Sequence, residues 1–273
     1  DYRYIKQQKL LTYRAFHNLY GESFVVYNPD FQKLKINEVF TTMANGKKVV
    51  APENAFNEVL PGNAANAPFY NSLREMVITH TGLERNAVIN LDYQVHTNKG
   101  VNPALMGNEL LAEIEPVKNL EIRVRIPEGK TLFFHLFNLE IKPVITTDGS
   151  FRVYTWKFSD IAPVAGEESQ PGINERYPRL IFSSSDNREE VYSFLTGQPA
   201  FLYAIPEEAK KMVNAILEEK KDKFDIALEI QDRVVNDMRY YSIPFRPAAY
   251  VCRTPEQTWN SNGGTAGEKT GLM

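Results

Sequence analysis

The stretch AVINLDYQVHT, residues 87–97, alternates between apolar and polar side chains over most of its length. The odd-numbered positions from Ala87 to Val95 place apolar side chains on one face, whereas Asn90, Asp92 and the polar residues after them fall on the other. A period of two residues is typical of a strand that is buried on one face only. The stretch therefore predicts a half-buried β-strand.

Two further runs repeat this pattern, LEIRVRI at 120–126 and FRVYTWKF at 151–158. Turn signals lie between such runs, at Asn45-Gly46, at Glu128-Gly129 and at Asp148-Gly149. Asn-Gly and Asp-Gly pairs adopt the positive φ angles that tight hairpins require. Short strands separated by turns at this spacing favour an antiparallel β-sandwich over a parallel α/β sheet.

The pattern becomes helical near Pro206. A proline followed by two glutamates suits the first turn of a helix, and an apolar stripe follows it from Ala209 to Leu217. A second helical pattern begins at Phe224 and is expected to end near Tyr240-Tyr241. The sequence thus predicts a mainly β fold with an α segment: an antiparallel β-sandwich module over residues 1–203 and a short helical region over 204–273.

Composition excludes several classes of function. Hydrophobic residues make up 43% and charged residues 24%, and the net charge of −3 offers no electrostatic basis for nucleic-acid binding. No apolar run approaches the ~20 residues of a membrane-spanning helix. The opening DYRYIKQQKLL lacks the apolar core of a signal peptide. The expected protein is neither a nucleic-acid binder nor an integral membrane segment.

Two longer phrases carry a family resemblance. The segment from VYNPDFQKLKINEVF through NGKKVVAPENAFNEVLPGNAANAPFYNSLREMVITHTGLE (26–84) resembles the β-rich DUF3857 domain, and FSDIAP (158–163) is similar to a phrase of the same family. The C-terminal region, with VVNDMRYY, a linker, Trp259 and a Gly-rich turn into a new helix, resembles the entry to a papain-like transglutaminase core, cut short at Met273. The resemblance implies a bacterial cell-envelope protein, periplasmic or secreted.

The resemblance also implies where a nucleophile would stand. That family carries its catalytic cysteine at a helix N-terminus, in a pattern close to Gly-x-Cys-x-Asp, where the helix dipole favours the thiolate. Here Ala266 occupies the cysteine position, Gly264 keeps the glycine, and Glu268 replaces the aspartate. We therefore expect no catalytic residue in this chain. The alternative is that the chain is the front portion of an active amide-hydrolysing or transglutaminase-like enzyme whose catalytic residues lie beyond it.

Other reactive side chains have ordinary explanations. The single cysteine, Cys252, lies in an extended segment and is expected to be an inert, buried thiol. The histidines lack the spacing of a zinc site, so neither a metal nor a cofactor is predicted. His96 is expected to be exposed and His135 to lie in the core or an interface; His17 and His80 complete the set.

Binding is expected, if anywhere, on the long loop 51–71, because long loops in compact domains are often functional. Its aromatic residues Phe56, Phe69 and Tyr70 are the candidate binding residues, with a peptide or a glycan as the expected ligand. A second irregular stretch is expected at 161–178. Strand aromatics such as Trp156 are better explained by core packing. A sugar-binding sandwich would require an exposed aromatic strip.

Overall fold

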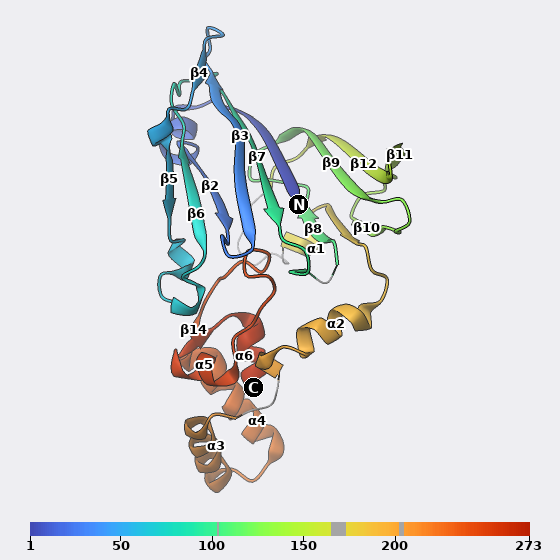
Figure 1. Cartoon of the computed structure of the whole chain (residues 1–273). Coiled ribbons are helices and arrows are strands. Elements are labelled where there is room, and N and C mark those ends of the chain that lie inside the picture. The colour runs from blue at the N-terminus through green and yellow to red at the C-terminus, as the bar shows by residue number, and fades with distance from the viewer. Residues whose placement is uncertain (103, 165–172, 202–204) are drawn as a thin grey trace. The chain divides into compact units, whose positions relative to one another are not determined.

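The computed structural model describes residues 1–102, 104–164, 173–201 and 205–273. The contacts divide the chain into two compact units (Figure 1). Unit 1 joins Asp1–Val101 with Leu195–Met273, and unit 2 is Asn102–Phe194. The predicted boundary between residues 203 and 204 marks the change from a β to a helical sequence pattern, which is a different criterion from the contacts that define the two units. That boundary stays a prediction.

Unit 1 contains two antiparallel sheets and a helical segment. One sheet has the order β1 (Tyr2–Lys9), β7 (Val88–Thr97), β3 (Gln32–Thr42) and β4 (Lys48–Val50), and the other has the order β2 (Glu22–Tyr27), β6 (Arg74–Thr79) and β5 (Phe56–Val59). Short helical turns are η1 (Ala15–Leu19), η2 (Glu53–Ala55), η3 (Gly62–Ala64), η4 (Pro68–Tyr70), η5 (Pro199–Phe201) and η6 (Arg233–Asp237). The C-terminal elements are α3 (Glu207–Glu219), α4 (Lys223–Asp232), β14 (Arg239–Tyr240), α5 (Pro255–Asn260), β15 (Gly263–Gly264) and α6 (Ala266–Leu272).

The predicted strand at 87–97 is β7, which lies between β1 and β3 in its sheet. Its buried residues Leu91 and Val95 pack with Val39 of β3 and with Val25 and Ile78 of the second sheet. The turn at Asn45-Gly46 joins β3 to β4, and Gly46 has a φ of 84°. The predicted sandwich is therefore confirmed here. The loop 51–71 is less irregular than expected, because residues 56–59 pair with β6 as β5.

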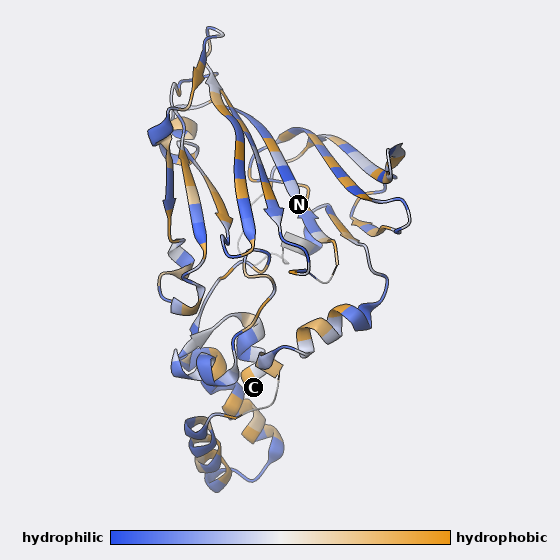
Figure 2. Cartoon of the chain, viewed as in Figure 1, coloured by the Kyte–Doolittle hydropathy of each residue, from blue (hydrophilic) through white to orange (hydrophobic). Residues whose placement is uncertain are grey.

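Unit 2 contains two antiparallel sheets of three strands. Their orders are β11 (Val144–Asp148), β12 (Phe151–Ile161), β9 (Val117–Pro127), and β10 (Phe133–Phe137), β13 (Arg179–Ser183), β8 (Met106–Leu110). The helices are α1 (Ile173–Arg176) and α2 (Arg188–Thr196), which ends across the unit boundary. Figure 2 shows apolar and polar residues alternating along β9 and β12, as the sequence pattern requires. Of the predicted loop 161–178, residues 165–172 lie outside the described part of the chain.

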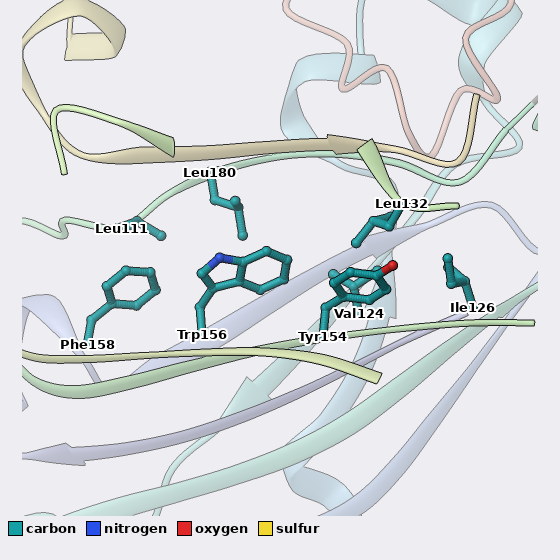
Figure 3. Packing of buried hydrophobic residues seen from close by; sticks show 8 residues of the cluster. All are labelled: Leu111, Val124, Ile126, Leu132, Tyr154, Trp156, Phe158 and Leu180. Carbon is teal, nitrogen blue, oxygen red and sulfur yellow. The ribbon is translucent and has the colours of Figure 1, made fainter. Parts of the chain in front are cut away.

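The core of unit 2 fills the space between β9–β12 and the strands β10 and β13. Figure 3 shows Trp156 among its neighbours, and its side chain is fully buried. The Asp148-Gly149 turn is confirmed as the hairpin between β11 and β12, with φ 61° at Gly149. The Glu128-Gly129 turn is different, because β9 pairs with β12 whereas β10 pairs with β13 in the other sheet. The strands it joins are therefore not a hairpin.

The helical segment differs in part from expectation. α3 begins directly after Pro206, as predicted. α4 ends at Asp232, and the π-helical turn η6 follows it directly. The helical conformation therefore ends at Asp237, before the predicted end near Tyr240. Phe224, Leu228 and Val235 recur at helical spacing, and all three are exposed. Periodicity locates an apolar face along a helix but does not identify what covers that face.

Candidate functional site

The segment that leads into α6 is fixed by two helix caps and two glycines. Thr254 caps α5 in a capping box with Gln257. β15 then runs parallel to β14, with Gly263 and Gly264 as its residues. A Cβ on Gly264 would lie 2.9 Å from Thr258 Cγ2 and 3.1 Å from the Cβ of Glu268. Glycine is therefore required at this position for the strand to approach the helices closely.

Ala266 is the first residue of α6, and its side chain is exposed. Thr265 precedes it as the N-cap and accepts a hydrogen bond from the backbone N–H of Glu268. The side chain of Glu268 in turn accepts from the backbone N–H of Thr265, which completes a capping box. The side chain of the first helical residue is thus a methyl group. That position 266 corresponds to the family's cysteine stays a prediction.

Glu268 lies at the centre of a buried polar cluster. Its Oε1 accepts hydrogen bonds from Tyr70 Oη at 2.6 Å, from the backbone N of Arg253 at 2.9 Å and from Arg253 Nε at 2.9 Å. Its Oε2 accepts from Arg253 Nη2 at 3.0 Å and from Thr265 N at 2.8 Å. The guanidinium also donates to Ser261 Oγ and to the carbonyl of Gly263. The Glu268–Arg253 pair therefore ties α6 to β15 and to the loop that carries Tyr70.

The cluster perturbs the titration of its members. Burial raises the pKa of Glu268, but hydrogen bonds from Arg253 and Tyr70 outweigh that effect, so its pKa lies below the ordinary value. Burial, followed by the hydrogen bond to Glu268, raises the pKa of Tyr70. The glutamate is therefore a carboxylate that is fully occupied by its donors, and it is not free to orient a catalytic base.

Cys252 lies beside the same helix, and its surroundings disfavour the reactive thiolate form. Its side chain is buried, and a Cβ on Gly267 would lie 3.2 Å from its Sγ. Burial raises the pKa of the thiol, and the negative charge of Glu268 raises it further. Both effects favour the thiol over the thiolate, which is the reactive form.

The three candidate binding aromatics separate into different environments. Tyr70 is buried and bonded to Glu268, so its hydroxyl is occupied by the polar cluster. Phe69 is 49% exposed and packs edge-on against Tyr70, with ring centroids 5.3 Å apart. Phe56 is half-buried on β5 and packs against the sandwich core. Of these three rings, only that of Phe69 is exposed, and the role of all three as binding residues stays a prediction.

Sequence reasoning missed Arg253, the cation that pairs with Glu268. The available signal was the Thr265-x-x-Glu268 spacing, which is a capping box and therefore places the glutamate against its own helix. The partners of the buried Glu268 carboxylate, Arg253 and Tyr70, are brought to it by the tertiary fold, and no local sequence spacing predicts them. Tyr70, which donates a hydrogen bond to Glu268, also belongs to a buried apolar cluster. The cluster consists of Ala64, Ala67, Tyr70, Leu73, Tyr241 and Ile243.

The histidines do not form a metal site. No group of three or more His, Cys, Asp or Glu side chains suitable for a metal occurs among the residues that the structure describes. His96 is exposed, as predicted. His135 is also exposed, so the expected core position is wrong, and the alternative of an interface position stays a prediction. His135 packs against Phe137 on the outer side of β10, because only alternate residues of that strand face the core.

His80 forms a pair that the sequence did not predict. Its Nε2 lies 2.8 Å from Ser23 Oγ, and burial lowers the pKa of the imidazole. The buried Nδ1 has no hydrogen-bond partner in the described chain. A nucleophilic serine requires a histidine that a third group orients, and that group is missing among the described residues. The pair joins β2 to the residue that follows β6.

Each unit has a cleft among its described residues. The cleft of unit 1 has a volume of about 430 Å³ and is lined mainly by polar residues of α4 and η6, such as Asp225, Glu229 and Asn236. The cleft of unit 2 has a volume of about 370 Å³ and is mainly apolar. Neither lining includes Ala266 or Glu268. Within the described residues, no helix is long and apolar enough to cross a membrane.

The structure is that of a mainly β protein with antiparallel sheets and a short helical segment. The chain is a member of the DUF3857 family, a domain of unknown function with solved structures, whose family model matches residues 1–165. The chain is also similar to a crystal structure from Parabacteroides distasonis described as a "putative protease". That similarity has a TM-score of 0.87 at 34% sequence identity and covers 99% of this chain. The comparison with curated proteins gives no match.

The match to the Parabacteroides protein covers 53% of that protein's chain, so the present chain spans about half of its length. At this identity the two proteins share the fold over the matched half. The family match covers β1 to β12, which includes the first segment of unit 1 and most of unit 2.

Proposed function

We propose that this chain is a non-catalytic β-rich module of a transglutaminase-like protein of the bacterial cell envelope, and that it binds a peptide or a glycan. The observation that carries the proposal is the exposed methyl group of Ala266 at the start of α6. A methyl group cannot attack a carbonyl carbon, so the position where the family resemblance expects a cysteine has no nucleophile.

The surroundings of Ala266 support the same conclusion. Glu268 accepts five hydrogen bonds and cannot act as a base without breaking the cluster. Cys252 is buried and its pKa is raised, so its thiolate population at neutral pH is small. Amide hydrolysis requires an activated nucleophile with a base in reach, and the described residues of this region supply neither.

A second candidate function is the front portion of an active amide-hydrolysing or transglutaminase-like enzyme. The name and the length of the Parabacteroides relative favour it, since that protein is about twice as long as this chain. In that case the present residues would provide the scaffold, and the catalytic residues would lie in the other half.

Hydrolysis of casein and of fluorogenic peptide amides by the purified chain tests the proposal. We expect no release above the buffer rate, and the same result for Ser23→Ala and Cys252→Ala. Hydrolysis that a single substitution abolishes would overturn the non-catalytic role. Cell fractionation followed by detection of the native protein tests the envelope assignment, which fails if the protein is recovered with the cytoplasmic fraction.

The correspondence of position 266 to a nucleophile position has its own test. In a Cys252→Ala background, the alkylation rate of Ala266→Cys is compared with that of Thr270→Cys, which is also exposed on α6. The first-turn amides are expected to lower the thiol pKa and raise the alkylation rate at neutral pH by about three- to tenfold over the control. Equal rates would remove the argument that this helix start is suited to a thiolate.

A further inference from the structure

The apolar cleft of unit 2 has the properties of a ligand site. Its volume of about 370 Å³ lies at the lower end of the range of ~300–1,000 Å³ typical of small-molecule pockets. Leu111 and Phe158 contribute to the lining and are also buried members of the core, so this part of the cleft wall is held by packing. Ile141 is 36% exposed and lines the same cleft. The size suits one or two amino-acid residues.

Asp160 lies in the lining of this cleft in an unusual backbone conformation. Its φ of 52° lies in the left-handed region, which few non-glycine residues other than Asp and Asn adopt readily. Ser159 remains opposite Asn119 and Ile161 opposite Val117, whereas Asp160 itself has no partner in the β12–β9 register. Strained residues of this kind are concentrated at ligand-binding positions.

The charge at this cleft is available to a ligand. Asp160 is exposed, and its carboxylate has no hydrogen-bond or ion-pair partner among the described residues. Lys157 also lines the cleft, but its ammonium lies 3.4 Å from Glu121 and is paired there. The unpaired charge in the lining is therefore negative. An apolar cleft with one free carboxylate favours a ligand that carries a cation next to an apolar group.

Trp156 gives a second observation at this end of the core. Its Nε1–H is buried and has no partner in the described chain, although buried indole N–H groups usually have one. Figure 3 shows the nitrogen edge of the ring on the side of Leu111, a lining residue. Leu111 therefore links the indole to the wall of the cleft, so Trp156 can report on binding there.

We propose that the cleft lined by Leu111, Ile141, Phe158 and Asp160 binds the amino-terminal residue of a peptide, with a large apolar side chain in the cleft and the α-ammonium group on Asp160. A peptide amino terminus combines the two required groups, which are a cation and an adjacent apolar side chain. The inference rests on the proposed role of the chain as a binding module, and it assigns peptide rather than glycan as the ligand.

The test is a fluorescence titration of the full chain carrying Trp259→Phe, so that Trp156 is the only indole. The ligand is phenylalanyl-leucine amide with a free amino terminus, and the matched ligand is its N-acetyl form. We expect a saturable change in Trp156 emission, with affinity about two- to fivefold weaker for the N-acetyl form, as a solvent-accessible ion pair would give.

Two variants separate the contributions to binding. Asp160→Asn keeps a residue that tolerates left-handed φ, and it is expected to bind both ligands with the weaker affinity and no discrimination. Ile141→Asn is expected to weaken both ligands by about tenfold or more, because it removes apolar contact area from the cleft. Its control is Ile145→Asn on β11, an exposed isoleucine outside the lining, which should leave binding unchanged.

The outcomes are distinguishable. Absence of a saturable change, equal affinity for the two ligands in the Trp259→Phe chain, or discrimination retained by Asp160→Asn would each overturn the peptide site. A response to N,N′,N″-triacetylchitotriose without a response to the peptide would also overturn it and would favour a glycan. Cleavage of the peptide during the titration, detected by chromatography, would refute the non-catalytic role. The binding data alone would still decide whether the cleft is the peptide site.

Discussion

Replacement of Glu268 by glutamine should destabilise unit 1 strongly and leave unit 2 unaffected. An amide oriented with its oxygen in the place of Oε1 still accepts from Tyr70 and twice from Arg253, but its nitrogen then faces Arg253 Nη2 and Thr265 N, which are both donors. Two of the five hydrogen bonds are lost and the guanidinium keeps an uncompensated buried charge. Removal of one partner of a buried ion pair costs about 3–5 kcal/mol, which we expect here.

The assay is urea unfolding of the full chain labelled with 5-fluorotryptophan and followed by fluorine NMR. Trp259 lies on α5 in unit 1 and Trp156 in the core of unit 2, so each unit has its own resonance. Glu268→Gln should lower the free energy of unfolding reported by Trp259 and leave that reported by Trp156 within about 0.5 kcal/mol.

The control is Glu256→Gln, which removes an exposed carboxylate from the first turn of α5 and should change stability by less than about 0.5 kcal/mol. Tyr70→Phe removes one hydrogen bond to the same carboxylate and should cost about 1.5–3 kcal/mol, which remains measurable if Glu268→Gln does not fold. If Glu268→Gln and Glu256→Gln have equal effects, the buried ion pair does not hold the C-terminal helix in place, and the reasoning is refuted.

Three other predictions concern pH, thiol reactivity and packing. The folded pKa of Glu268 lies below its ordinary value of 4.5. Its contribution to the stability of unit 1 should therefore be complete above pH 4.5 and be lost as the pH falls through the lower folded pKa. The unfolding midpoint reported by Trp259 should show this pH dependence more strongly in the parent chain than in Glu268→Gln. Cys252 should alkylate with iodoacetamide far more slowly in the folded chain than in urea, since burial and Glu268 both raise its pKa, and mass spectrometry checks this; equal rates would contradict the buried assignment. Gly107→Ala places a Cβ 2.1 Å from Phe182 Cζ and should lower the stability of unit 2 by about 1–3 kcal/mol in the Trp156 transition, whereas Gly129→Ala, with nothing within 4 Å, is the neutral control.

The sequence predicts local structure well where a period of two residues is sustained. The runs at 87–97, 120–126 and 151–158 all form strands, namely β7, β9 and β12. It does not predict which strands pair. The Glu128-Gly129 turn connects β9 to β10, which belong to different sheets, because pairing depends on contacts between residues far apart in the chain.

The site is predicted less well than the fold. The helix start at Ala266 follows from the local capping pattern of Thr265 and Glu268. The partners of Glu268 do not follow, because Tyr70 comes from a loop 198 residues earlier. The same limit applies to the cleft of unit 2, where the left-handed φ of Asp160 has no signature in an otherwise regular strand pattern.

The two-segment composition of unit 1 has a consequence for synthesis on the ribosome. Tyr70 emerges 198 residues before Glu268. At a translation rate of about 5–20 residues per second, the delay is about 10–40 s. Unit 2, which is continuous from Asn102 to Phe194, is complete before unit 1 receives its last segment. Throughout that interval, Ala64, Ala67 and Leu73 of the nascent chain lack Tyr241 and Ile243, the residues that pack against them in the finished fold. Chaperone binding to this chain during translation is therefore expected on residues 61–73 rather than on the strands.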